Sequence, residues 1–260
     1  MIKKIVSMII LSMMSVVFFM GCEKEEPAPT PTPTPDPSEP VAPAPVFLLD
    51  AVTDIDGNHY DAVQIGDQVW MAQNLRTTHF ADNTEAGGTS PDGDENNVEA
   101  YGRLYVWNAV MHSDTSSSAN PSGVQGICPD GWHVPSDAEW TQLTDYIINC
   151  GYYACGNDPT AIAKSMADTA GWNTSYAENA VGNNPAANNT TGFTVRPAGV
   201  RLRNQAPSNF GSQARFWSCT EIDDGTNNSA IYRGFYYHSG LVGTGSSTKM
   251  DAYSVRCVKD

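Results

Sequence analysis

The stretch that decides the fold of this chain is Ile127-Cys128-Pro129-Asp130-Gly131-Trp132-His133-Val134-Pro135-Ser136-Asp137-Ala138-Glu139-Trp140. It reads as a short strand, a turn that contains proline and glycine, and the start of a helix. Ser136 and Glu139 have the spacing of a capping box, in which each side chain binds a backbone N–H of the other residue. Trp140, Leu143 and Ile147 then share one helical face. We therefore predict an amphipathic helix that begins at Ser136 and packs its apolar face on a core.

The cysteines indicate how this stretch is tied to the rest of the chain. Cys128 stands just before the predicted helix, which spans residues 136–148, and Cys257 lies in an apolar run near the C-terminus. A disulfide between these two cysteines would join the middle of the domain to its end. We pair them on that ground, although the sequence alone leaves the connectivity open.

The remaining cysteines allow one more disulfide and leave one thiol over. Cys150 and Cys155 close a very short loop, so a bridge between them requires a tight turn after the helix. Cys219 is then unpaired. It is either a reactive thiol or a small buried strand residue, and its neighbour Trp217 favours burial.

Composition sets limits on the class of function. The 260 residues carry a formal net charge of −15, which argues against a nucleic-acid partner because phosphates require neutralisation by Lys and Arg. The six Trp and eleven Tyr residues are enough to build a core, so the chain is not predicted to be disordered throughout.

The N-terminus indicates export. Residues 1–21 place two lysines before an apolar run that is short for a membrane span, which is typical of a signal peptide. Gly21-Cys22 resembles the end of a bacterial lipobox, which predicts lipidation of Cys22. The following Glu23-Lys24-Glu25-Glu26 resembles the acidic tag of surface-exposed Bacteroidetes lipoproteins. The alternative is an ordinary secretory signal with a chance cysteine.

Residues 22–46 are predicted to be a disordered, lipid-anchored linker. Nine of the 17 prolines fall between Pro27 and Pro45, mostly alternating with Thr or Ala. Such a segment extends as polyproline II at about 3.1 Å per residue, so it reaches roughly 60 Å from the membrane. A stalk is the favoured interpretation, and a docking ligand is the alternative.

The rest of the chain has the pattern of an α+β domain with two helices, short antiparallel strands and long polar loops. The second helix is predicted from Asp158-Pro159 to Ala167, because Asp caps helices and Pro suits their first turn. Strands are predicted at 52–55, 60–65, 68–72, 193–196, 215–219, 231–237, 241–242 and 252–258. Polar loops as long as residues 81–99 and 171–192 are functional or poorly ordered in most compact domains.

Several short motifs occur together in this chain. They are Asp54-Ile55-Asp56-Gly57-Asn58, Val69-Trp70-Met71-Ala72-Gln73-Asn74-Leu75, Tyr101-Gly102-Arg103-Leu104-Tyr105, the stretch 128–140, Phe216-Trp217-Ser218 with Thr220-Glu221, and Ser254-Val255-Arg256-Cys257-Val258. Their order resembles the Fibrobacter succinogenes major paralogous domain, here over residues 47–260. That family is similar in layout to the C-type-lectin-like fold, including the version used by sulfatase-modifying enzymes. The resemblance implies this fold, and it implies no particular activity.

Late aromatic residues are the candidates for ligand contact. Pyranose rings pack on aromatic side chains, so we predict ligand contacts from Trp217, Tyr232, Tyr236 and Tyr237. We also include Glu221, which lies close to Trp217 in the sequence, among the predicted contacts. Strand alternation places Tyr232 and Tyr236 on one face and Tyr237 on the other, so part of this set belongs to the core.

An acidic loop is the candidate metal site. Asp92, Asp94 and Asn96 supply closely spaced oxygen ligands that suit Ca²⁺, although the loop lacks a full twelve-residue calcium pattern. The alternative is a chance polar loop. Arg103, Arg196, Arg233 and Arg256 occur among apolar residues and need carboxylate or carbonyl partners if buried, with Glu221 as one candidate.

Together these features predict an outer-membrane lipoprotein that faces the cell exterior, held to the membrane through the lipid on Cys22. Its head is predicted to be a non-catalytic binding module for carbohydrate or another adhesion ligand. One alternative is a structural subunit that binds envelope proteins. The other, less favoured, is an enzyme related to sulfatase-modifying factors, because no acid–base or paired-cysteine constellation stands out in the sequence.

Overall fold

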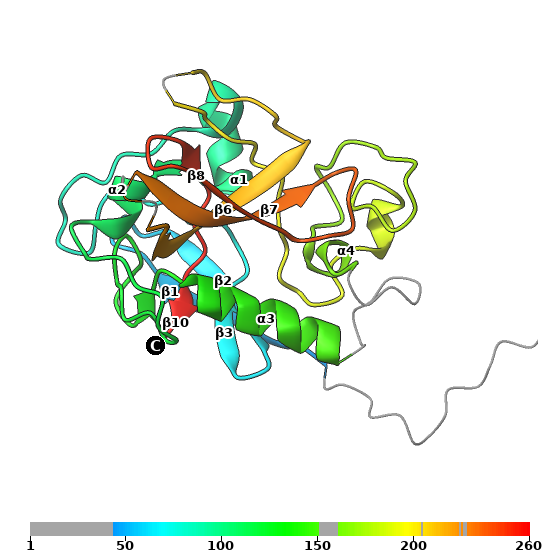
Figure 1. Ribbon diagram of the computed structural model, residues 1–260, viewed down its shortest axis with the longest axis horizontal. Coiled ribbons are helices and arrows are strands. Elements are labelled where there is room, and N and C mark those ends of the chain that lie inside the picture. The colour runs from blue at the N-terminus through cyan, green and yellow to red at the C-terminus, as the bar shows by residue number, and fades with distance from the viewer. Residues whose placement is uncertain (1–43, 151–160, 204, 224, 226–227) are drawn as a thin grey trace, which may run out of the picture. The chain divides into compact units, whose positions relative to one another are not determined.

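Three antiparallel sheets and one long helix make up the part of the chain that the computed structural model describes, residues 44–150, 161–203, 205–223, 225 and 228–260. Mixed helix and antiparallel sheet confirm the predicted α+β class. The predicted signal peptide and nearly all of the predicted linker lie outside these residues. Figure 1 shows helix α3 (Asp137–Asn149) running between the strands of the two larger sheets.

The largest sheet brings the two ends of the domain together. Its strand order is β1 (Val46–Thr53), β2 (His59–Ile65), β3 (Gln68–Met71), β10 (Val258–Lys259) and β5 (Trp132–His133). Strands β1 and β2 overlap the predicted strands at 52–55 and 60–65 and form a hairpin, with a turn at Asp54–Gly57. Val258 pairs with both Trp70 and His133, so the last strand lies inside the sheet between segments far earlier in the chain.

The second sheet contains β6 (Gln213–Glu221), β7 (Ser229–Tyr236) and β8 (Gly243–Thr248), and the third pairs β4 (Tyr105–Val106) with β9 (Ala252–Tyr253). Three strand predictions differ from this. Residues 193–196 form no strand, and only Val195 makes an isolated bridge, to Ala167. The strand predicted over residues 252–258 is broken into β9 and β10, because residues 254–257 turn inward to bond several neighbouring segments. The strand predicted at residues 241–242 begins two residues later, at Gly243.

Helix α3 confirms the predicted capping box. The Ser136 hydroxyl accepts from the Glu139 N–H, and the Glu139 carboxylate accepts from the Ser136 N–H. The described residues hold three further short α-helices and three 3₁₀ turns rather than one more helix: α1 (Val98–Tyr101), α2 (Trp107–Met111), α4 (Ala163–Met166), and the turns Pro91–Gly93, Glu95–Asn97 and Pro185–Ala187. The predicted start of the second helix at Asp158 lies outside the described residues. Within those residues, no helix has the length and apolarity needed to cross a bilayer.

An aromatic cluster joins α3 to both large sheets. Trp140 of α3 lies 4.6 Å from Trp70 of β3, 5.8 Å from Phe193 and 5.7 Å from Phe216 of β6, measured between ring centroids. All four side chains are fully buried. Such pairs add roughly 0.5–1.5 kcal/mol each beyond the area they bury, so this cluster is a major source of stability.

A buried cation holds the C-terminal segment in place. The guanidinium of Arg256 is fully buried and donates to Asn74 Oδ1 and to the carbonyl oxygens of Met71, Phe193 and Thr194. It also lies 4.7 Å from the Phe193 ring centroid. Burial lowers the pKa of Arg256 to about 9. The predicted need for carbonyl partners is therefore met, because neutral oxygens from two segments, 71–74 and 193–194, share this charge.

The disulfide predicted between Cys128 and Cys257 is present, with a Cα–Cα distance of 6.0 Å and a sequence separation of 129. It joins the turn before β5 to the residue beside Arg256. Closing so long a loop stabilises a domain by roughly 2–5 kcal/mol, because it restricts the unfolded chain.

The turn before α3 is fixed by a buried ion pair. His133 Nε2 lies 2.6 Å from Glu139 Oε1, and His133 Nδ1 lies 2.7 Å from Asp260 Oδ1. Glu139 Oε2 accepts from the backbone N–H groups of Ser122 and Ser136. Burial alone would lower the pKa of His133, but its bonds to Glu139 and Asp260 outweigh burial and raise it.

Replacing His133 by Phe is expected to destabilise the protein most at mildly acidic pH. The raised pKa means that protonated His133 contributes stability below the ordinary pKa of 6.5, and that this contribution disappears as the pH rises through the folded value. We expect a loss of about 3–5 kcal/mol at pH 6, because Glu139 is left buried without its partner, and a smaller loss at pH 9.

Urea unfolding at the two pH values measures this effect. The exposed His238 provides a control, because its replacement by Phe should change little at either pH. An equal loss for His133→Phe at pH 6 and pH 9 would contradict the ion-pair assignment.

Candidate functional site

A single β-turn separates two pockets on the surface of the head. The Trp132 N–H donates to the Pro129 carbonyl at 3.0 Å, and Gly131 supplies the positive φ, 77°, that such turns favour at their third residue. Asp130 lines the pocket on each side of this turn. We call the two together the Asp130 pocket pair.

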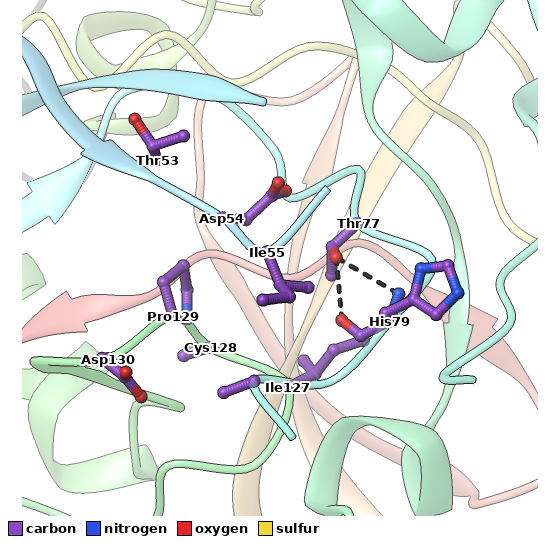
Figure 2. A pocket seen from close by; sticks show the side chains of 10 residues that line it. Thr53, Asp54, Ile55, Thr77, His79, Ile127, Cys128, Pro129 and Asp130 are labelled. Atoms are coloured by element: carbon purple, nitrogen blue, oxygen red, sulfur yellow. Dashed lines mark hydrogen bonds between the residues drawn. The ribbon is translucent and has the colours of Figure 1, made fainter. Parts of the chain in front are cut away.

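The first pocket, shown in Figure 2, has a volume of about 200 Å³. Its walls come from three separate segments, listed as Thr53, Asp54, Ile55, Thr77, His79, Ala81, Ile127, Cys128, Pro129 and Asp130. Figure 2 shows Ile55 between Asp130 at one end and His79 at the other. The pocket thus combines an apolar centre with polar groups at its ends.

Asp56 holds one wall of this pocket in position. Its carboxylate accepts from the Thr77 hydroxyl, from the Thr78 hydroxyl and N–H, and lies 2.6 Å from His79 Nδ1. Partial burial would raise the pKa of Asp56, but the hydrogen bonds from Thr78, His79 and Thr77 outweigh it and lower the pKa to about 2. The segment 77–79 is therefore fastened to the β1–β2 turn by one ionised side chain.

The second pocket has a volume of about 320 Å³ and lies on the other side of the turn. It is lined by Pro121, Gly123, Gln125, Asp130, Gly131, Trp132, His133 and Asp260. This lining combines an indole, a carboxamide, an imidazole and two carboxylates. Both imidazole nitrogens of His133 are bound to carboxylates, so its ring orientation is fixed.

Oxygen acceptors are available in the pocket pair. Gln125 Nε2 donates to Asp130 Oδ1 at 2.9 Å, and within the described residues no group donates to Asp130 Oδ2. Likewise, within the described residues no group donates to Asp260 Oδ2, whereas Asp260 Oδ1 binds His133 Nδ1. Both oxygens of Asp54, by contrast, are bound by Asn58 and Tyr60. Asp130 and Asp260 are therefore the carboxylates that keep an oxygen for a ligand.

The five predicted ligand contacts are not gathered on one surface. Trp217 is fully buried 4.4 Å from Tyr253, and Tyr237 packs against the core around α3. Tyr232 and Tyr236 share the face opposite to Tyr237, as alternation predicted, and Trp217 pairs with Tyr232 on that same face. The guanidinium of Arg215 covers the Tyr232 ring at 4.7 Å, and Tyr232, Tyr236 and Tyr237 are each partly buried. Glu221 pairs with Lys249, so it is not the arginine partner proposed from the sequence.

The other three arginines have the carboxylate partners that the sequence analysis requires. Arg103 pairs with Glu95, Arg196 with Asp168 and Arg233 with Asp137. These ion pairs all lie away from the Asp130 pocket pair.

The predicted calcium loop is held by its own side chains. Asp94 Oδ1 accepts from the N–H and the amide of Asn96, and Asp92 adopts a positive φ in the preceding turn. In the described part of the chain, no three His, Cys, Asp or Glu side chains are grouped as metal ligands. Calcium binding by Asp92, Asp94 and Asn96 stays a prediction.

The remaining cysteine predictions have different outcomes. Cys219 is buried and unpaired, as expected, and burial raises the pKa of its thiol to about 12. Cys150 follows the last turn of α3, and Cys155 lies outside the described residues, so their pairing stays a prediction. Lipidation of Cys22 falls outside the described residues as well.

The sequence did not point to the pocket pair. The Pro-Asp-Gly turn was visible, but it was interpreted only as a break between strand and helix. His79, Gln125 and Asp260 come from distant segments, and no local pattern links them. The only available signal was a polar turn placed directly after a disulfide cysteine.

Replacing Asp56 by Asn is expected to destabilise the protein by about 1–2 kcal/mol at pH 7. The folded pKa of about 2 lies below the ordinary 3.8, so ionised Asp56 contributes stability above pH 3.8 and loses it as the pH falls through 2. The difference between the variant and the native protein in urea unfolding should therefore vanish near pH 2. A difference that is the same at pH 7 and pH 2 would show that the ionised carboxylate is not the cause.

Comparison with known proteins assigns the family. No curated protein and no solved structure matches this chain. The sequence model of the Fibrobacter succinogenes major domain matches residues 63–259, which includes both sides of the Asp130 turn and the last strand. That match spans most of the 260 residues, so the chain belongs to the Fibrobacter succinogenes major domain family.

Proposed function

We propose that this protein is a surface-exposed outer-membrane lipoprotein whose head is a non-catalytic carbohydrate-binding module. Residues 1–21 act as the signal peptide, Cys22 carries the lipid, and residues 22–46 form the stalk that presents the head, residues 47–260. The lipobox-like Gly21-Cys22 and the proline-rich linker support this arrangement. The head adopts a C-type-lectin-like fold in this proposal, supported by β10 lying in the sheet beside early strands.

The observation that carries the binding function is the Asp130 pocket pair. Carbohydrate sites need acceptors and donors for hydroxyl groups next to apolar surface for the ring. Asp130, Asp260 and Gln125 supply the polar groups, and the exposed residues Ile55 and Pro121 supply the apolar surface. Because the walls are fastened by a disulfide and by buried hydrogen bonds, the site is pre-formed, which reduces the entropy cost of binding.

Two observations favour binding over catalysis. The Cys219 thiol stays protonated at physiological pH because its pKa is raised to about 12, so it is a poor nucleophile. His133 uses both ring nitrogens to bind Glu139 and Asp260, which leaves no nitrogen free for proton transfer to a ligand. A sulfatase-modifying activity is accordingly the least favoured alternative.

A protein-binding role is the second candidate, and β1 is the observation that favours it. This strand lies at the edge of the five-stranded sheet, where its outer backbone groups have no strand partner in the described part of the chain. It also exposes Val46, Phe47 and Leu49. Edge strands with apolar side chains are sites where another chain can add a strand.

A glycan array with the full-length protein in detergent, with calcium and then with chelator, tests the carbohydrate function. We expect hits that Ile55→Trp weakens at least tenfold, because the indole fills the first pocket at a half-exposed position. Met250→Trp is the matched control, since Met250 is similarly exposed and lines neither pocket. Retained binding by Ile55→Trp would move the site towards Tyr236.

The chelator and a blank array complete this test. Loss of binding on chelation would support the loop of Asp92, Asp94 and Asn96 as a calcium site. A blank array from folded protein would contradict the carbohydrate function and favour the role of β1 in protein binding.

A further inference from the structure

We propose that the two pockets are adjoining subsites of one groove, which binds a linear, uncharged glycan of at least two sugar units across Asp130. This inference rests on the proposed carbohydrate function and specifies its ligand. It follows from the geometry of the turn, the size of the two pockets and the charges that line them.

The wall between the pockets is only one β-turn wide. Pro129 and Trp132 are its first and last residues, and the Cα atoms of such positions lie less than about 7 Å apart. Asp130 projects at this wall and is exposed, so one ligand can contact it from both sides. A linear chain of sugars can place neighbouring units on the two sides of a barrier of this width.

The volumes of the two pockets also support a single ligand that occupies both. Sites for small organic ligands measure about 300–1,000 Å³. The first pocket, about 200 Å³, lies below that range, and the second, about 320 Å³, lies at its lower end. Taken together, the two volumes fall well inside it, so the pair suits a ligand that neither pocket holds alone.

The charge of the lining selects against acidic ligands. Among the described residues that line the pair there is no Lys or Arg, whereas Asp54, Asp130 and Asp260 all contribute carboxylates. Asp130 Oδ2 and Asp260 Oδ2 accept hydrogen bonds, which suits the hydroxyl groups of a neutral sugar. The negative charge of a uronic acid or a sulfated sugar would be repelled by these carboxylates, which disfavours binding of acidic glycans.

Asp130 is the residue that the inference singles out. Gln125 orients its carboxylate through Oδ1 and leaves Oδ2 at the junction of the subsites. A hydrogen bond to a charged acceptor is stronger than one to a neutral acceptor. Asp130 should therefore matter most for ligands long enough to cross the turn.

Titration calorimetry on the full-length protein in detergent tests the proposal. The probes are oligosaccharides of one to four units in β-1,4-glucose, β-1,4-xylose, α-1,4-glucose and α-1,6-mannose series, with oligogalacturonates as the acidic series. We expect at least one neutral series to bind at least tenfold more tightly as a dimer than as a monomer. Oligogalacturonates should bind at least tenfold more weakly than that dimer, and salt should narrow this difference.

Two variants test whether Asp130 is responsible for the tighter binding of the dimer. Asp130→Asn should weaken binding of the dimer about tenfold and leave binding of the monomer within twofold. Glu178→Gln is the control, because Glu178 is an exposed acid that lines neither pocket, and it should change nothing. Among the described residues, Gln125 is the only hydrogen-bond partner of the Asp130 side chain, so the fold should survive its replacement, and a thermal melt checks this.

The outcomes separate the two proposals. Equal affinity for monomer and dimer, or tight binding of oligogalacturonates, would overturn the groove while leaving carbohydrate binding standing. An Asp130→Asn variant that binds the dimer normally would also overturn it. Absence of binding in every series would overturn the carbohydrate function, and the groove with it.

Discussion

The buried segment Arg256-Cys257-Val258 supports the arrangement of the whole head. The charge of Arg256 lies in the core without a carboxylate partner and is satisfied by oxygens from two other segments, 71–74 and 193–194. Cys257 bonds covalently to the turn before β5, and Val258 places the last strand between β3 and β5. A cation held by neutral oxygens is stable only while all of them stay in place, so this segment makes distant parts of the chain depend on one another.

That dependence explains how a short polar turn becomes a defined surface feature. The residues on either side of the Asp130 turn are held from two directions: Cys128 by the disulfide, and His133 by Glu139 at the start of α3. The facing wall of the first pocket is held separately, through Asp56 and the segment 77–79. Such support from the core gives a surface turn the rigidity that a pre-formed binding site requires.

The local features of the fold could be predicted from the sequence, whereas few of the long-range features could. The capping box at Ser136 and Glu139, the β1–β2 hairpin and the alternation of Tyr232 and Tyr236 were predictable because each depends on residues close in the chain. The Cys128–Cys257 disulfide was also predicted, because Cys128 lies just before the helix and Cys257 lies in the last apolar run. The pocket pair was not predicted, because the residues that line it, such as His79, Gln125 and Asp260, come from segments that lie far apart in the sequence. Aromatic residues of β6 and β7 that looked suited to ligands are mostly needed to fill the cores on both faces of that sheet.

The Cys128–Cys257 disulfide and the buried pair of His133 and Glu139 together hold the Asp130 turn in place. Hydrogen–deuterium exchange on the full-length protein, compared before and after replacement of both cysteines by serine, tests this role of the disulfide. We expect faster exchange of the amides of residues 127–134 and of β10, with the central turns of α3 still protected by the aromatic cluster around Trp140. Unchanged protection of residues 127–134 in the variant would contradict it.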